Sequence, residues 1–176
     1  MDVKKTLITG ALLAGLLAVA GVAYSVDDDD DDEGGNPAAL AQALTQATVS
    51  LEQALKASER EGKPISAKFE LEDGKLQLSV YTANGKGFEE VIVDHRSGAI
   101  SKTEPITAGE DLEHARAQSR AMAKAKTSLS QAVQNSLKAN AGYRVVSVVA
   151  RLAGGQPVAA IDLMKGTEVK KDTEKL

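Results

Sequence analysis

A stretch of sequence near residue 50 recurs near residue 128, and this repeat constrains the fold more than any other feature. Thr48–Leu55 and Lys126–Val133 share the pattern Ser-Leu-x-Gln-Ala at equivalent positions. The same offset pairs Val91 with Val169 and Asp94 with Asp172. Self-similarity at a fixed period indicates repeated copies of one supersecondary unit. The sequence therefore predicts a body made of two similar units.

The first unit has the pattern of a helix followed by an antiparallel sheet. Apolar residues recur at three- and four-residue steps along one helical face, and Ser50 with Gln53 resembles a capping box that starts the main helix. The Ala-rich stretch Pro37–Ala47 is either a separate helix or part of the same one. Strands follow at Ile65–Glu72, Lys75–Val80 and Phe88–Val93, with turns at Asp73-Gly74, Asn84-Gly85 and Ser97-Gly98. We expect a three-stranded meander whose apolar face the helix covers.

The second unit repeats this scheme after a helical connection. Thr107–Lys126 is predicted to be helical, with Thr107 and Glu110 as its cap. No helix breaker lies between Glu110 and Asn135, so we expect this helix to fuse with the helix of the second unit. That helix ends at Asn140 and Gly142, and strands follow at Val146–Leu152, Ala159–Leu163 and Gly166–Lys171. The predicted fold class is α+β, with two helix-plus-antiparallel-sheet units, 38–106 and 107–176, joined by a helical linker.

Residues 1–25 have the features of an export signal. Lys4 and Lys5 precede an uncharged run from Thr6 to Val26, and Ala23-Tyr24-Ser25 fits the small-x-small cleavage pattern. The run is also long enough for an uncleaved membrane anchor, and a buried terminal helix is the third alternative. We therefore expect a periplasmic or secreted protein, or an inner-membrane-anchored one whose body lies outside the cytoplasm. Membrane contact is expected only through this segment, and only if it is not cleaved.

An acidic run, Asp27–Asp32 with Glu33, separates this segment from the predicted helices. Like charges repel and Asp is a poor helix former, so residues 26–37 are predicted to be a disordered acidic linker. Weak cation binding and docking to a partner are the alternatives. The chain has 25 acidic and 21 basic residues, and without the eight acidic and two basic residues before Asn36 it has 17 and 19. This nearly neutral body does not favour nucleic-acid binding.

Residue types that carry out chemistry are sparse. The absence of Cys excludes disulfides, thiolate metal sites, Cys nucleophiles and lipid attachment through Cys. His95 and His114 are the only histidines, and neither has metal-binding spacing. Glu89 and Glu90 are adjacent on a predicted strand, so they point to opposite faces and cannot form an acid–base pair. We expect a noncatalytic protein with no catalytic, cofactor or metal site.

A basic stripe crosses the predicted connecting helix. Arg116, Arg120 and Lys124 follow one another at four-residue steps, which places them on one side of a helix. Such a stripe is either an ordinary solvated face or a docking surface for an acidic partner, the chain's own Asp run included.

The order and spacing of these motifs resemble the PepSY domain family. Ser50–Leu55 matches a helix pattern Ser/Thr-x-x-x-Ala, and Asp94–Ile100 matches the pattern Asp-x-x-[Ser/Thr]-Gly-x-[Ile/Val] that follows the sheet. The resemblance covers Thr48–Lys102. It is weaker in the second unit, where Asp172 is followed by Thr173–Leu176 without a glycine, so that copy is truncated or diverged.

The resemblance implies a noncatalytic binding module. PepSY domains occur in propeptides of secreted metallopeptidases and in bacterial envelope proteins, and they are proposed to inhibit peptidases or to regulate proteolysis locally. By this resemblance we expect a protein partner, an envelope or secreted peptidase that the chain binds, inhibits or regulates. The alternative is a structural or sensory envelope protein without a peptidase. In the Asp94–Ile100 turn, Asp94 is expected to accept backbone hydrogen bonds and Gly98 to supply a positive φ angle.

Overall fold

The computed structural model describes residues 36–176, and the predictions for the export signal and for the acidic run lie outside these residues. Four helices and seven strands follow one another along the described chain. They are α1 (Pro37–Leu44), α2 (Leu51–Ser58), β1 (Lys63–Glu72), β2 (Lys75–Asn84), β3 (Gly87–Val93), β4 (Ile100–Ile106), α3 (Gly109–Lys124), α4 (Leu129–Ala139), β5 (Arg144–Ala153), β6 (Gln156–Lys165) and β7 (Glu168–Lys175). The α+β class is confirmed.

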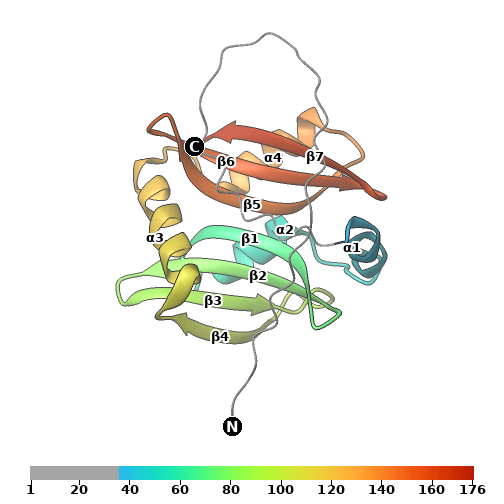
Figure 1. Ribbon diagram of the computed structural model, residues 1–176, viewed down its shortest axis with the longest axis horizontal. Coiled ribbons are helices and arrows are strands. Elements are labelled where there is room, and N and C mark those ends of the chain that lie inside the picture. Colours follow the sequence, from blue (N-terminus) through green and yellow to red (C-terminus); the bar gives the residue numbers. More distant parts are fainter. Residues whose placement is uncertain (1–35) are drawn as a thin grey trace, which may run out of the picture.

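All seven strands belong to one antiparallel sheet, in the order β4-β3-β2-β1-β5-β6-β7. We call α1 to β4 the first half of the chain and α3 to β7 the second half. The helices α2 and α4 lie behind the sheet in Figure 1, while α1 and α3 lie at opposite sides of it. Both halves contribute side chains to one hydrophobic core between the sheet and the helices.

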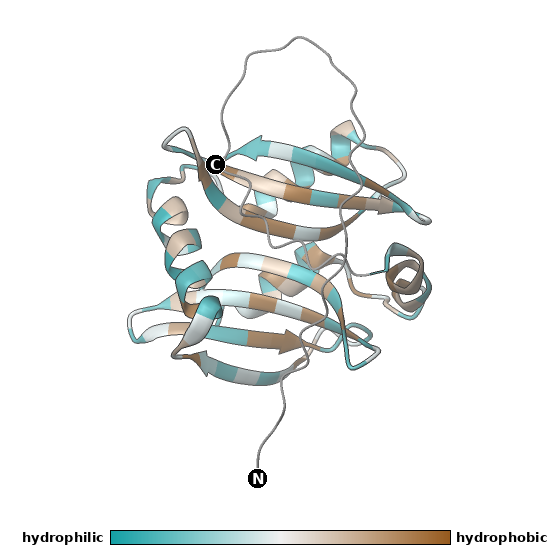
Figure 2. Cartoon of the chain, in the orientation of Figure 1, coloured by the Kyte–Doolittle hydropathy of each residue, from teal (hydrophilic) through white to brown (hydrophobic). Residues whose placement is uncertain are grey.

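The predicted alternation of apolar side chains along β1 and β2 is confirmed. Ala67, Phe69, Leu78 and Val80 are buried on the face that packs against α2. Figure 2 shows brown and pale segments along the central strands, whereas the edge strands β4 and β7 are mostly teal and white. The capping box of α2 is also confirmed, because the Ser50 hydroxyl accepts from the Gln53 amide and the Gln53 side chain accepts from the Ser50 amide.

The two halves are joined by the pairing of β1 with β5. Three residue pairs form this ladder: Ser66 with Val149, Ala67 with Val148 and Lys68 with Ser147. The strand β1 begins at Lys63 and β5 at Arg144, and the spacing of these two residues along the chain equals that of Ala67 and Val148. Equivalent residues of the two halves therefore meet, and an approximate two-fold axis passes between Ala67 and Val148.

The repeat has two offsets instead of one. The helices α2 and α4 begin at equivalent positions of the sequence repeat, Leu51 and Leu129, but α4 has 11 residues and α2 has 8. The three extra residues of α4 make the offset between equivalent strands larger than that between equivalent helices. Asp172 is consequently not equivalent to Asp94: it lies within β7, whereas Asp94 lies in the turn after β3. The pairing of these two aspartates by the offset of the helices is wrong.

The predicted fusion of the connecting helix with the second-unit helix is also wrong. Helix α3 ends at Lys124, and Ala125 has an extended backbone with φ −68° and ψ 139°. Helix α4 begins anew after Ser128, whose hydroxyl accepts from the Gln131 amide. A serine cap can start a helix without any Gly or Pro to end the preceding one. The predicted Thr107 cap fails too, because Ala108 is the N-cap of α3 and makes no side-chain hydrogen bond.

A fourth strand extends the predicted three-stranded meander. The strand β4 pairs with β3 from Ile100 opposite Val93 to Ile106 opposite Phe88. Its five central residues are exposed to solvent. Because both sides of this edge strand face water, its sequence lacks the apolar alternation by which a half-buried strand is detected.

Arg144 ties the second half to the loop that follows α1. Its guanidinium donates to the carbonyl oxygens of Leu44 at 3.1 Å, Ala47 at 3.4 Å and Val49 at 2.7 Å. The guanidinium carbon lies 4.7 Å from the centroid of the Phe69 ring. The last carbonyl groups of a helix lack intrahelical partners, and the planar fork of arginine can satisfy several acceptors at once. One side chain thus closes the end of α1 from the other half of the molecule.

Lys63, the residue equivalent to Arg144, makes the reciprocal contact. Its ammonium donates to the carbonyl oxygen of Met122 at 2.8 Å, near the end of α3. Met122 has the place in the second half that Leu44 has in the first, so the cation of each half reaches the first helix of the other half. Beside Lys63 lies a cavity of about 380 Å³, lined by Pro64 and Leu129 among others.

The two cations make a matched pair of stability measurements. Arg144→Lys is expected to lower the free energy of unfolding by about 2–3 kcal/mol, because a single ammonium nitrogen cannot reach the three carbonyl oxygens that two guanidinium nitrogens span, and unpaired buried acceptors are costly. Lys63→Arg is expected to leave stability unchanged or to raise it by up to about 1 kcal/mol, because the added guanidinium has a cavity to occupy. Urea denaturation measures both, and equal effects of the two variants would contradict the three-acceptor role of Arg144.

Candidate interaction site

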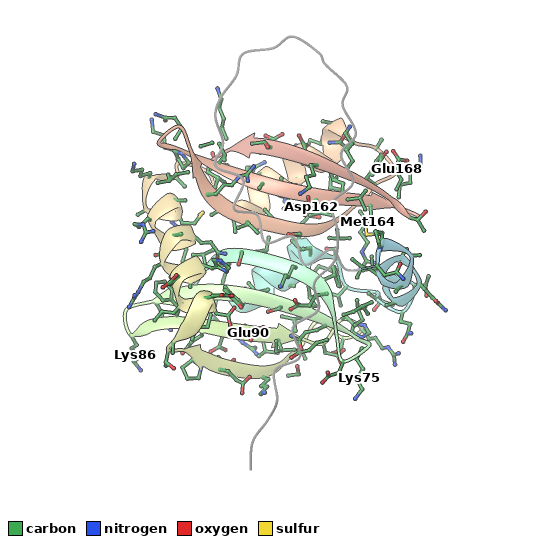
Figure 3. The ribbon with its side chains drawn as sticks, viewed as in Figure 1. Lys75, Lys86, Glu90, Asp162, Met164 and Glu168 are labelled. Carbon is green, nitrogen blue, oxygen red and sulfur yellow. The ribbon has the colours of Figure 1, made fainter. Side chains whose placement is uncertain are left out.

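One face of the sheet is left uncovered by α2 and α4, and we call it the open face. It is turned toward the viewer in Figure 1, with α3 along one end of it. Alternate residues of each strand point to it, and the strand register places them in rows that cross the sheet. One row runs Glu104, Glu90, Tyr81, Ser66, Val149, Ala160, Thr173. Figure 3 labels Glu90 on β3 and Asp162 on β6, which are two residues of this face.

A hydrogen-bonded acidic cluster occupies the first-half side of the open face. The Tyr81 hydroxyl donates to Asp111 of α3 at 2.8 Å, and the Ser79 hydroxyl donates to Glu90 at 2.5 Å. Burial raises the pKa of Tyr81, and so does its hydrogen bond to the Asp111 carboxylate. Burial also raises the pKa of Glu90, and the neighbouring carboxylates add to this while the Ser79 hydrogen bond opposes it. The surroundings of Glu90 therefore disfavour the charged form of its carboxyl group.

The pKa of Glu90 predicts a pH-dependent effect of one substitution. A raised pKa in the folded protein means that folding favours the protonated carboxyl, so stability at this site falls as the pH rises above the ordinary value of 4.5. Glu90→Gln is expected to raise the melting temperature at pH 7 by about 1–2 °C and to have no effect near pH 4. Thermal denaturation at the two pH values measures this. A lower melting temperature at pH 7 would contradict the assignment.

The turn after β3 matches the geometry expected for Asp94–Ile100. The Asp94 carboxylate accepts from the amides of Arg96 at 3.0 Å and Ser97 at 2.7 Å and from the Ser97 hydroxyl at 2.9 Å. These hydrogen bonds from Ser97 and Arg96 lower the pKa of Asp94. Gly98 has a φ angle of +76°, as predicted for this position. The roles expected for Asp94 and Gly98 are confirmed.

This turn also holds the loop between α1 and α2. The His95 carbonyl oxygen accepts from the amides of Thr48 and Val49, and the Thr48 hydroxyl donates to the Arg96 carbonyl oxygen at 2.5 Å. The loop is thus held from one side by the turn and from the other by Arg144. The motif that carries the family resemblance is therefore accounted for by packing of the first half, and its polar groups are used within the chain.

The two histidines lie apart from each other. His114 is exposed on α3. The Nδ1 atom of His95 is buried, and no residue of 36–176 forms a hydrogen bond with it. His95 lines a cavity of about 370 Å³ with Lys75, Gln77 and Ser101 among others. Among the described residues, no group of three or more His, Cys, Asp or Glu is placed to hold a metal ion.

The basic stripe predicted on the connecting helix is on the surface of α3. Arg116, Arg120 and Lys124 are all exposed. The Lys124 ammonium donates to the Gly155 carbonyl oxygen at 3.3 Å, which links α3 to the β5–β6 turn. Docking of an acidic partner on this stripe stays a prediction. Within 36–176, no helix is long and apolar enough to cross a membrane.

The outer strand β7 has an internal hydrogen-bond network on its helix side. The Asp172 carboxylate accepts from the Ser136 hydroxyl at 2.5 Å and from the side-chain amide nitrogen of Asn140 at 3.0 Å. The Lys170 ammonium donates to the side-chain oxygen of Asn140. The hydrogen bond from Ser136 is the main reason that the pKa of Asp172 is lowered. The Thr173 amide donates to the Asp172 carboxylate at 2.8 Å. Asp172 thus anchors β7 to α4, which is a different role from that of Asp94.

The sequence alone did not indicate the open face or the acidic cluster. Tyr81 and Asp111 come from a strand and a helix that the sequence assigned to different units. The alternation on β2 did mark Ser79 as facing away from the core. The alternation could not predict that Ser79 lies beside Glu90, because this depends on the order of the strands in the sheet.

Comparisons with known proteins assign no family. No protein-family model matches the chain, and no curated protein matches it. Among solved structures, the chain is similar to the crystal structure of a "putative lipoprotein" from Clostridium difficile, with 17% sequence identity and a TM-score of 0.32 over 68% of this chain and 88% of that one. A similarity this low gives no argument about fold or function.

Proposed function

We propose that the chain is an exported, noncatalytic binding module of the cell envelope that binds and inhibits or regulates an envelope or secreted peptidase. The resemblance to PepSY domains supplies the partner class. The observation that carries the proposal is the free edge of β7. A sheet edge binds an extended peptide by adding it as a further strand, with backbone hydrogen bonds giving affinity and side chains giving specificity.

The first half of the chain provides a precedent for strand addition at the equivalent edge. The strands β3 and β7 occupy equivalent places, and β4 pairs with β3 over its length. Among the described strands, none pairs with the outer side of β7. Unpaired edge groups are a template for another strand. The extended segment of a peptidase would take the place on β7 that β4 takes on β3.

The orientation of one amide identifies which residues of β7 would pair with such a segment. The Thr173 amide donates to the Asp172 carboxylate, so this N–H points to the outer edge of the sheet. Alternate residues of an antiparallel strand point their amides to the same side, which places the Lys171 amide at the outer edge as well. Lys171 is exposed. Proline is tolerated at outward positions of edge strands, as Pro105 on β4 illustrates.

The test removes one backbone hydrogen-bond donor from the outer edge of β7 and leaves the other residues of that edge unchanged. The full chain is expected to co-purify with an envelope peptidase from the source cells and to slow that enzyme stoichiometrically. Lys171→Pro is expected to reduce the affinity at least about tenfold, because it removes an outward backbone donor. Lys171→Gln is the matched control, and it should bind within about threefold of the wild type because its amide is retained.

The outcomes separate the proposal from its alternative. Inhibition that is lost in Lys171→Pro and retained in Lys171→Gln supports binding at the β7 edge. Equal inhibition by both variants would show that the peptidase binds at a site other than the β7 edge. If the chain slows no envelope peptidase and captures none, peptidase regulation is wrong, and a structural or sensory envelope role replaces it.

A further inference from the structure

We propose that the acidic run, Asp27–Asp32 with Glu33, docks within its own chain on three lysines of the β6–β7 hairpin. We call Lys165, Lys170 and Lys171 the lysine patch. The occupant of this patch is thus a named segment of the same chain. The argument rests on the side chains of the patch, on the charges at the equivalent places of the first half and on the length of chain between the run and α1.

The lysine patch lies around the side chain of Tyr143, just before β5. The ammonium groups of Lys165 and Lys170 each lie 5.8 Å from the centroid of the Tyr143 ring. The Lys170 ammonium also donates to Asn140, and Lys171 follows Lys170 on the edge strand β7. All three lysines are exposed. An ammonium group has three donors, so even Lys170 keeps the capacity to bind a carboxylate.

The repeat shows that the fold does not require lysines at these positions. The spacing that relates Lys63 to Arg144 also relates the hairpin β2–β3 to the hairpin β6–β7. At this spacing, the places equivalent to the lysine patch are occupied in the first half by Asn84, Glu89 and Glu90. The same three positions thus carry two negative charges in one half and three positive charges in the other. The lysines are a property of the second half alone.

The charge of the acidic run complements that of the second half. Residues 107–176 contain 11 basic and 7 acidic residues, and residues 36–106 contain 8 basic and 10 acidic. These counts include every charged residue of α3 and give net charges of +4 and −2. The run itself has seven carboxylates. Because complementary charge steers association and selects the partner surface, the second half is the favoured site for the run.

Arg144 brings α1, to which the run is joined, close to the lysine patch. Its guanidinium donates to the Leu44 carbonyl oxygen at the end of α1 at 3.1 Å. On the sheet, Arg144 pairs with Met164 of β6, which pairs with Val169 of β7. Figure 3 labels Met164 and Glu168 on the same side of the molecule as α1. The patch therefore lies within two strand spacings, about 10 Å, of the residue that holds α1.

The length of chain before α1 is sufficient for this contact. Helix α1 has eight residues and is about 12 Å long. Glu33 is three residues before Asn36 and Asp27 is nine, so the run can reach roughly 10–30 Å from the start of α1. A tether this short holds the carboxylates near the patch at millimolar effective concentration, so weak ion pairs suffice. Figure 1 shows the basic stripe of α3 on the opposite side of the sheet from α1, which makes it the less accessible surface.

Zero-length crosslinking on the full chain tests the contact. A carbodiimide joins a carboxylate to a lysine amine where the two groups touch, and mass spectrometry of the digested protein identifies the joined residues. At about 50 mM salt, where screening is weak, the run is expected to be joined mainly to Lys165, Lys170 and Lys171. At about 500 mM salt the yield is expected to fall at least about fivefold, because salt screens exposed charges.

Two variants with the same change in net charge separate the lysine patch from the basic stripe. Lys165→Glu with Lys171→Glu retains Lys170 as the reporter, and the crosslinks between Lys170 and the run are expected to fall at least about tenfold. Arg116→Glu with Arg120→Glu is the matched control on α3, and it should leave these crosslinks within about twofold of the wild type. Thermal denaturation checks that both variants fold. If the patch variant does not, Lys165→Gln replaces it, with an expected loss of about twofold.

A mixture of isotope-labelled and unlabelled chain identifies the occupant. Crosslinks that join labelled peptides only to labelled ones are expected, because the run docks within its own chain. Mixed pairs would show that the run of a second copy occupies the patch, which overturns the proposal. Crosslinks mainly to the exposed Lys75 and Lys86 of the first half, labelled in Figure 3, or to Lys124 of the basic stripe would overturn it too. So would the lack of any crosslink to the run, or an equal loss in the patch variant and its control.

Discussion

The pairing of β1 with β5 is the interaction on which the rest of the structure depends. It spans three residue pairs, yet it merges two short meanders into one seven-stranded sheet with one core. The approximate two-fold axis through Ala67 and Val148 also explains why Lys63 and Arg144 make matching contacts. Two small sheets that met in another way would leave different edges, a different face and different ends of α1 and α3 to be closed.

Local patterns predicted the elements of each half well, because local physics determines them. The Ser50 capping box, the Asp73-Gly74 hairpin and the alternation along β1 and β2 all involve neighbours in sequence. Predictions failed where a second helix cap interrupted a continuous helical pattern, or where a strand was exposed to solvent on both sides. The break between α3 and α4 follows from the cap at Ser128, and β4 escaped detection because water surrounds both of its sides.

The candidate site was predictable in one part only. Asp94 and Gly98 could be assigned from sequence because a turn of this kind is closed by residues within a few positions. The open face depends on the edge-to-edge joining of the halves, and no residue pattern on β1 or β5 states that these two strands will pair. The role of Asp172 was missed for a related reason, since three extra residues in α4 changed which positions are equivalent.

The reciprocal contacts of Arg144 and Lys63 have a consequence for cooperativity. The first helix of each half ends on carbonyl groups that a cation of the other half satisfies. Neither half can therefore satisfy the end of its own first helix in this way in isolation, even though each contains all the residues of its own meander. Loss of one half exposes acceptors in the other, and so the halves gain and lose order together. The repeat in the sequence thus encodes one cooperative unit, built like an obligate dimer whose two subunits share a single chain.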